Sequence, residues 1–138
     1  MPGRKRYDAL KSAVDDVQLP IFVSRDGTFY LDPSFDGQAW ETLKTASDNI
    51  ADKAKDLDDH PHLHGSHQEH AGDLLTAATT FQQMALTAYN EWRAVPDGGE
   101  VKQTEAMVGL GNVLQFMKGK LRDFDQDKLD ALTAAFGS

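Results

Sequence analysis

Four stretches of the chain repeat apolar residues at alternating steps of three and four, and this pattern constrains the fold more than any other feature. The clearest stretch comprises Leu74, Ala78, Phe81, Ala85, Ala88 and Trp92. Residues spaced in this way share one face of an α-helix. The pattern predicts a helix near 67–93, and Ser66-x-x-Glu69 just before it matches a capping box.

Three further stripes predict three more helices. The first contains Tyr7, Leu10, Val14 and Val17, and Pro20 follows it as a stop signal. The second begins after Asp32-Pro33-Ser34 and contains Trp40, Leu43, Ser47, Ile50, Ala54 and Leu57. The last contains Met107, Leu110, Leu114, Met117 and Leu121. Each stripe favours a helix that buries one face against its neighbours.

The ends of the last stripe carry their own signals. Asp97-x-x-Glu100 can cap its start, and Asp123-x-x-Gln126 can cap a separate short fifth helix that ends near Gly137. Three glycines, at 109, 111 and 119, lie within the stripe. Glycine costs up to about 1 kcal/mol in a helix interior, so we expect a close helix contact or a local break there.

The only strong β signal is the segment 21–31, in which Ile21-Phe22-Val23 and Phe29-Tyr30-Leu31 flank an Asp-Gly pair. If that pair forms a two-residue turn, Phe22 faces Leu31 and Val23 faces Tyr30. Both faces of the hairpin then carry apolar side chains, and one face is left for a second covering element or another protein molecule. A hairpin tucked under its own helices is the simpler interpretation and is favoured over a hairpin that binds a partner.

Together these patterns predict one domain over 1–138: a mainly all-α, antiparallel bundle of four to five helices with one short N-terminal β-hairpin. The chain has 138 residues and no cysteine, which excludes disulfide scaffolds and thiolate chemistry. Its charge of −8 argues against nucleic-acid binding, which depends on basic side chains that neutralise phosphates. No apolar run is long enough to cross a membrane, and no signal peptide follows the basic start. We therefore expect a cytoplasmic protein.

All five histidines of the chain lie between His60 and His70. Imidazole nitrogens are common ligands of Zn²⁺ and Ni²⁺, so His60, His64, His67 and His70 are the candidate metal ligands, with Asp59 as a possible oxygen donor. The spacing matches no established metal signature, and a polar connecting loop without a specific role is the favoured interpretation. A cofactor is therefore not expected unless this segment binds Zn²⁺ or Ni²⁺.

Other catalytic and ligand-binding motifs are incomplete or absent. The alternating acids from Asp123 resemble the start of an EF-hand, but Lys128 and Ala134 occupy the positions that need glycine and glutamate. Complete nucleotide-binding glycine patterns and a nucleophile elbow are absent. An enzyme with an unfamiliar active site remains an alternative without specific support.

The remaining class is a non-enzymatic protein–protein interaction module, such as an adaptor, an assembly factor, a phage component or an inhibitor. Its candidate contact residues are Phe22 and Tyr30 on the hairpin together with Asp52, Asp56 and Asp59 on the acidic second helix. The partner is another protein or a second copy of this chain. A metal-binding or pH-responsive protein using the histidine segment is the main alternative.

Overall fold

The computed structural model describes residues 4–61, 63, 65–96, 99 and 102–137, with the backbone alone for 23, 29 and 127–137. Its elements are α1 (Arg4–Asp16), β1 (Ile21–Val23), β2 (Phe29–Leu31), α2 (Gly37–Asp58), α3 (Gly65–Arg93) and α4 (Glu105–Gly137). The chain is mainly helical with one two-stranded antiparallel hairpin, as the sequence predicts. Within this part of the chain, four helices are present.

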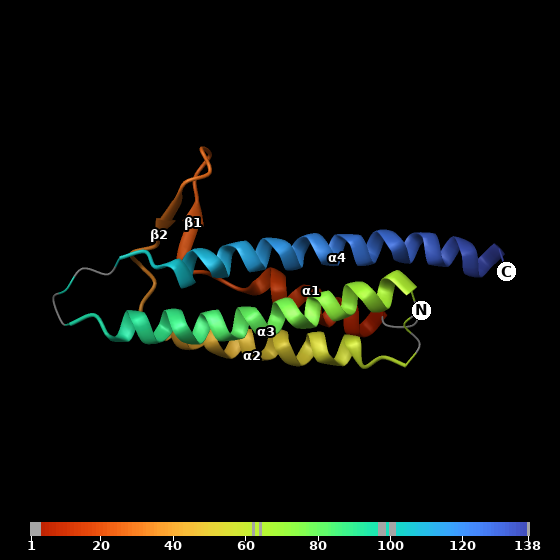
Figure 1. The fold of residues 1–138 in the computed structure, drawn as a ribbon, viewed down its shortest axis with the longest axis horizontal. Coiled ribbons are helices and arrows are strands. Elements are labelled where there is room, and N and C mark those ends of the chain that lie inside the picture. The colour runs from red at the N-terminus through yellow and green to blue at the C-terminus, as the bar shows by residue number, and fades with distance from the viewer. Residues whose placement is uncertain (1–3, 62, 64, 97–98, 100–101, 138) are drawn as a thin grey trace.

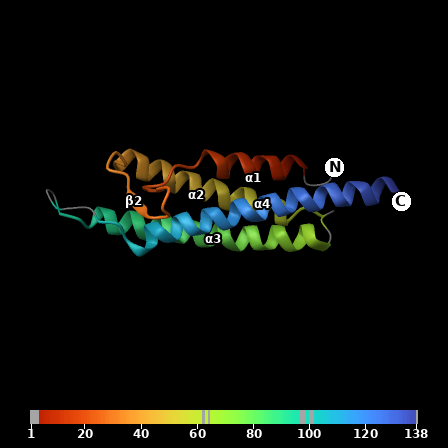
Figure 2. The ribbon, with the colours of Figure 1, turned by 90° about the horizontal axis from the view of Figure 1, so that it is seen from above.

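Each helix runs opposite to the one before it, so the four form an up-down-up-down bundle (Figures 1 and 2). Polar contacts link α1 to α2, α2 to α3, α3 to α4 and α4 to α1: Arg6–Asp56, Gln82–Asp48, Lys120–Asp73 and Tyr7–Leu121. In both views the C-terminal end of α4 extends past the other helices. None of the described helices has the length and apolar character needed to cross a bilayer.

The predicted stripes form the core. In α2 the buried residues are the six of the predicted stripe: Trp40, Leu43, Ser47, Ile50, Ala54 and Leu57. All five predicted residues of the last stripe are buried in α4, and only Val17 and Trp92 at the ends of their stripes are partly exposed. The one polar member, Ser47, is satisfied because its hydroxyl donates to the Lys44 carbonyl at 2.7 Å.

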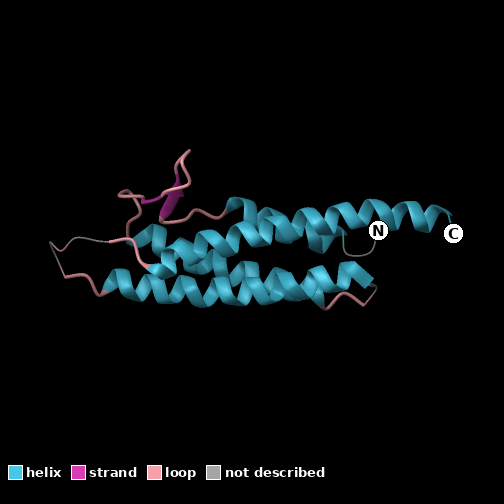
Figure 3. Ribbon diagram, turned by 45° about the horizontal axis from the view of Figure 1, so that its top comes forward, coloured by secondary structure: helices cyan, strands magenta, loops and turns pink. Residues whose placement is uncertain are grey.

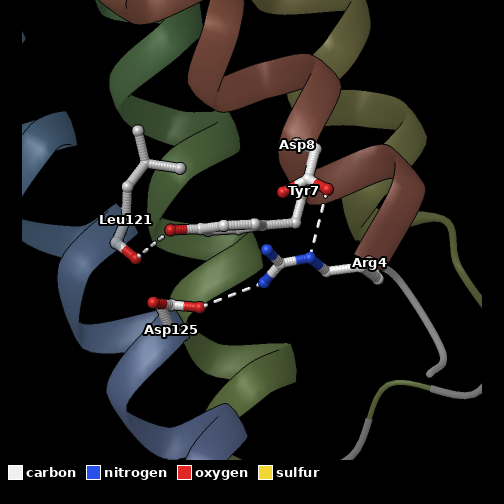
Figure 4. Close-up of polar contacts among 5 residues, drawn as sticks. All are labelled: Arg4, Tyr7, Asp8, Leu121 and Asp125. Carbon is white, nitrogen blue, oxygen red and sulfur yellow. Dashed lines mark hydrogen bonds and ion pairs between the residues drawn. The ribbon is translucent and has the colours of Figure 1, made fainter.

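Tyr7 fixes α1 to α4 (Figure 4). Its hydroxyl donates to the Leu121 carbonyl at 2.9 Å, and its ring stacks on Phe124 with centroids 5.0 Å apart. At the same end, Arg4 lies 3.1 Å from the carboxylate of Asp8 and 3.3 Å from that of Asp125. The N-terminal turn of α1 is therefore bound to α4 by both a buried hydrogen bond and an exposed ion-pair network.

The helix ends differ from the predictions. α3 begins at Gly65, which has a φ of +57°, so Ser66 lies inside the helix instead of capping it. Thr104 caps α4, since its hydroxyl oxygen accepts from the Met107 backbone N–H at 3.3 Å. The predicted cap at 97–100 falls mostly outside the described residues. The prediction of a separate fifth helix is wrong, because α4 continues without a break through Asp123.

One glycine of α4 accounts for a close helix contact. A Cβ atom at Gly109 would lie 2.8 Å from the sulfur of Met84 on α3. Real Cβ atoms do not approach this closely, so a side chain at this position would require the flexible end of Met84 to move. Gly119 has no such contact, because a Cβ atom at that position would lie 3.8 Å from its nearest neighbour, a nitrogen of Arg122.

Candidate interaction surface

The hairpin connects the end of α1 to the start of α2 and stands off the bundle (Figures 1 and 3). Its paired residues are Ile21 with Leu31, Phe22 with Tyr30 and Val23 with Phe29. Alternate residues of a strand point to opposite faces. Ile21 is buried in the core with Leu31 packed beside it, so Phe22 and Tyr30 lie on the outward face.

The register predicted from a two-residue turn is wrong by one residue. The backbone N–H of Ser24 bonds to the Thr28 carbonyl at 2.9 Å, and the loop between them contains three residues, ending at Gly27 with a φ of +83°. A three-residue hairpin loop needs such a left-handed residue in its last position, which glycine adopts without strain. The Asp-Gly signal located the turn correctly but not its length.

Asp26 holds this loop together. Its carboxylate accepts hydrogen bonds from the Ser24 hydroxyl and, at 3.0 Å, from the Thr28 backbone N–H. These bonds favour the charged form and hold the pKa of Asp26 below its usual value. The carboxylate thus ties both ends of the loop together, and the strands beneath it are held in a fixed register.

Phe22 and Tyr30 form what we call the aromatic pair. Their ring centroids are 5.7 Å apart and the rings are stacked at 25°. Phe22 is 52% exposed and Tyr30 is 45% exposed, and neither contributes to the core of the described residues. The pair is a small apolar surface on a projecting element, held in shape by the strand pairing.

Asp52, Asp56 and Asp59, the acidic trio, are all exposed at the C-terminal end of α2. The hairpin lies at the other end of that helix. Asp52 is fifteen residues after Gly37, which corresponds to about 22 Å at 1.5 Å per residue. The structure therefore does not combine the trio and the aromatic pair into one surface.

Of the four candidate metal ligands, His64 lies outside the described residues. His60 follows α2, whereas His67 and His70 lie in the first two turns of α3. The His67 ring packs on Phe124 with centroids 4.6 Å apart, and its Nε2 atom is buried. Among the residues that the structure describes, no three histidine, aspartate or glutamate side chains gather as a metal site would require.

Two further exposed apolar residues were not singled out by the sequence. Leu86 and Phe116 are each 49% exposed, on α3 and α4. Both lie next to a buried residue of their stripe, but one position out of phase with it. A search for large apolar residues that fall outside the 3-4 pattern would have identified them.

Comparison with known proteins adds nothing to these observations. No protein-family model, curated protein or solved structure matches the chain.

Proposed function

We propose that this chain is a small, acidic, non-enzymatic interaction module of the cytoplasm, and that it docks another protein through the hairpin. The aromatic pair is the observation that supports this best, because two rings that are each about half exposed are held on the outward face of the hairpin. The hairpin itself projects from the bundle (Figure 3). Aromatic residues are enriched at protein interfaces, where they supply large contact areas at low entropic cost.

The size of the hairpin favours a partner that surrounds it over a second copy that meets it face to face. A fully buried aromatic side chain contributes about 150–250 Å². Two half-exposed rings on each copy therefore fall far short of the ~800 Å² per partner that a stable interface buries. A projecting hairpin gains much more area when it enters a cleft, which covers the outward face and an open strand edge together.

Charge supports the same surface. Between residues 17 and 31 the only charged side chains are Arg25 and Asp26, so the segment has no net charge in a chain of −8. An apolar cleft can enclose this hairpin without desolvating an unpaired charge other than at the loop tip. The acidic trio is then a separate surface, and we propose no joint contact for it with the hairpin.

The test is site-specific photocrosslinking in the source cells, with the crosslinking residue placed at Phe22. We expect one discrete adduct, and we expect Tyr30→Ser introduced in the same protein to abolish it. The matched control places the crosslinker at Phe116, which is similarly exposed but lies on α4. An adduct of twice the chain mass would identify a second copy as the partner and contradict docking into a cleft.

The crosslinking result can be interpreted only if the substituted proteins fold as the parent does. Removing an exposed cross-strand pair costs about 0.2–1 kcal/mol, so the Phe22→Ser and Tyr30→Ser variants should melt within a few degrees of the parent. Equal crosslinking from positions 22 and 116, or crosslinking that survives Tyr30→Ser, refutes the hairpin as the docking element.

A further inference from the structure

A groove of about 410 Å³ runs between α1 and α4, on elements separate from the hairpin. Its floor is formed by Tyr7 and Leu121, which are 3% and 2% exposed. Exposed polar side chains form its rim: Lys11 from α1, and Gln115, Lys118 and Arg122 from α4. Figure 4 shows Tyr7 spanning from α1 to Leu121 at this junction.

The groove is positively charged although the chain has 22 acidic and 14 basic residues. Among the described residues that line it, the one acid, Asp15, is bonded to Lys11 at 2.8 Å. Lys118 and Arg122 lie one helical turn apart on α4, and neither makes an ion pair with any residue that the structure describes. Two uncompensated cations therefore face solvent beside one groove.

Nearby acids are already engaged. Asp8 and Asp125, whose negative charges raise the pKa of the Tyr7 hydroxyl, both contact Arg4. The Tyr7 hydroxyl itself donates to the Leu121 carbonyl, so it does not offer a free donor to a ligand. The polar recognition that this groove can provide comes from the cations and amide of its α4 rim.

We propose that this groove binds a small organic phosphate: one phosphate group on an apolar body. An arginine guanidinium matches the oxygens of phosphate with two parallel N–H bonds, and lysine adds a point charge. Gln115 precedes Lys118 by three residues on the same helix and contributes an amide donor. The volume exceeds that of a phosphate ion, and the methylene stems of the rim side chains supply apolar contact for the organic part.

The test uses phenyl phosphate and inorganic phosphate as probes, titrated into isotopically labelled protein while backbone amide shifts are followed. We expect saturable shifts centred on 115–122, with tighter binding of phenyl phosphate. Binding should weaken with added salt, since the exposed charges are screened over ~8–10 Å. The Lys118→Gln, Arg122→Gln double variant should lose about fivefold to tenfold in affinity, as removal of exposed charge contacts does.

The matched control is Lys53→Gln with Lys55→Gln on α2, which removes the same charge elsewhere. It should bind phenyl phosphate as the parent does. Equal losses in both double variants would show a response to net charge alone and overturn the site. Equal affinity for the two probes would remove the organic body from the proposal, and no saturable shift would end it.

Discussion

The α1–α4 junction allows a sharp test at Tyr7. Burial, followed by the negative charge of Asp125, raises the pKa of Tyr7 to about 12, while Arg4 acts in the opposite direction. In the unfolded chain a tyrosine titrates near pH 10. Folding therefore favours the protonated phenol, and this stabilisation is complete below pH 10 and is lost as the pH rises towards 12.

The magnitude follows from that shift. A rise in the pKa from 10 to about 12 stabilises the folded state, and about 1.4 kcal/mol of this stabilisation is lost by pH 11, halfway between the two values. We reduce this loss to about 1 kcal/mol because the hydroxyl lies beside an open groove where solvent screens it. Tyr7→Phe removes the titrating group and its bond to the Leu121 carbonyl but keeps the ring stack on Phe124. The lost bond costs about 1 kcal/mol at pH 7.

These two free energies predict that the stabilities of the variant and the parent converge as the pH rises. Tyr7→Phe should be about 1 kcal/mol less stable than the parent at pH 7, and about equal to it at pH 11. Urea unfolding at fixed temperature measures both values, and other groups that titrate at high pH cancel in the difference. Tyr30→Phe, at the exposed hairpin position, serves as the control for the loss of a phenol. A difference that stays constant from pH 7 to pH 11 would refute the reasoning.

Three further outcomes are expected. Gly109→Ala should change the stability by less than about 1 kcal/mol in thermal melts, because the Met84 sulfur that the new methyl would meet at 2.8 Å belongs to the flexible end of its side chain and can move, while alanine has the better helix propensity; a loss of more than about 2 kcal/mol would show that Met84 cannot move. Asp36 caps α2, since its carboxylate accepts a hydrogen bond from the Ala39 backbone N–H at 2.9 Å; Asp36→Ala should therefore cost about 1 kcal/mol in the same melts, whereas Asp36→Asn should cost less. If the histidines of 60–70 bind Zn²⁺ or Ni²⁺, calorimetric titration of the metal into tag-free protein should give saturable heat at pH 7.5. The heat should be much smaller at pH 5.5, because protonated imidazole cannot coordinate a metal; no heat at pH 7.5 ends that hypothesis.

The core was predictable because burial follows helix periodicity directly. A residue such as Phe81 or Leu110 is buried with its stripe whichever neighbour covers it, so spacing alone identifies it. Helix ends were not predictable in the same way. Several Ser, Thr and Asp residues near each boundary can cap a helix, and packing selects one of them, as it selects Thr104.

Local sequence signals predicted the strands of the hairpin but not their register. Its two strands and the outward apolar face were predicted, but the register depends on whether the loop contains two residues or three. The sequence around Gly27 permits both, and the left-handed glycine together with the bonds of Asp26 belongs to the longer loop. Because Phe22 pairs with Tyr30 in this register, the two rings stack on one face and do not lie on opposite faces.

The α1–α4 groove could not be predicted, because its charge depends on which acids and bases meet in space. Composition gives a strongly acidic chain, and that average hides Lys118 and Arg122. The register of α1 against α4 places Arg4 beside Asp125, whereas the bond of Asp15 to Lys11 forms within α1 and does not depend on that register. Stripe spacing defines the face that each helix buries but not its axial position along its neighbour. A one-turn shift of α1 would place other α1 side chains opposite Lys118 and Arg122, so the charge of this groove depends on a register that stripe spacing does not define.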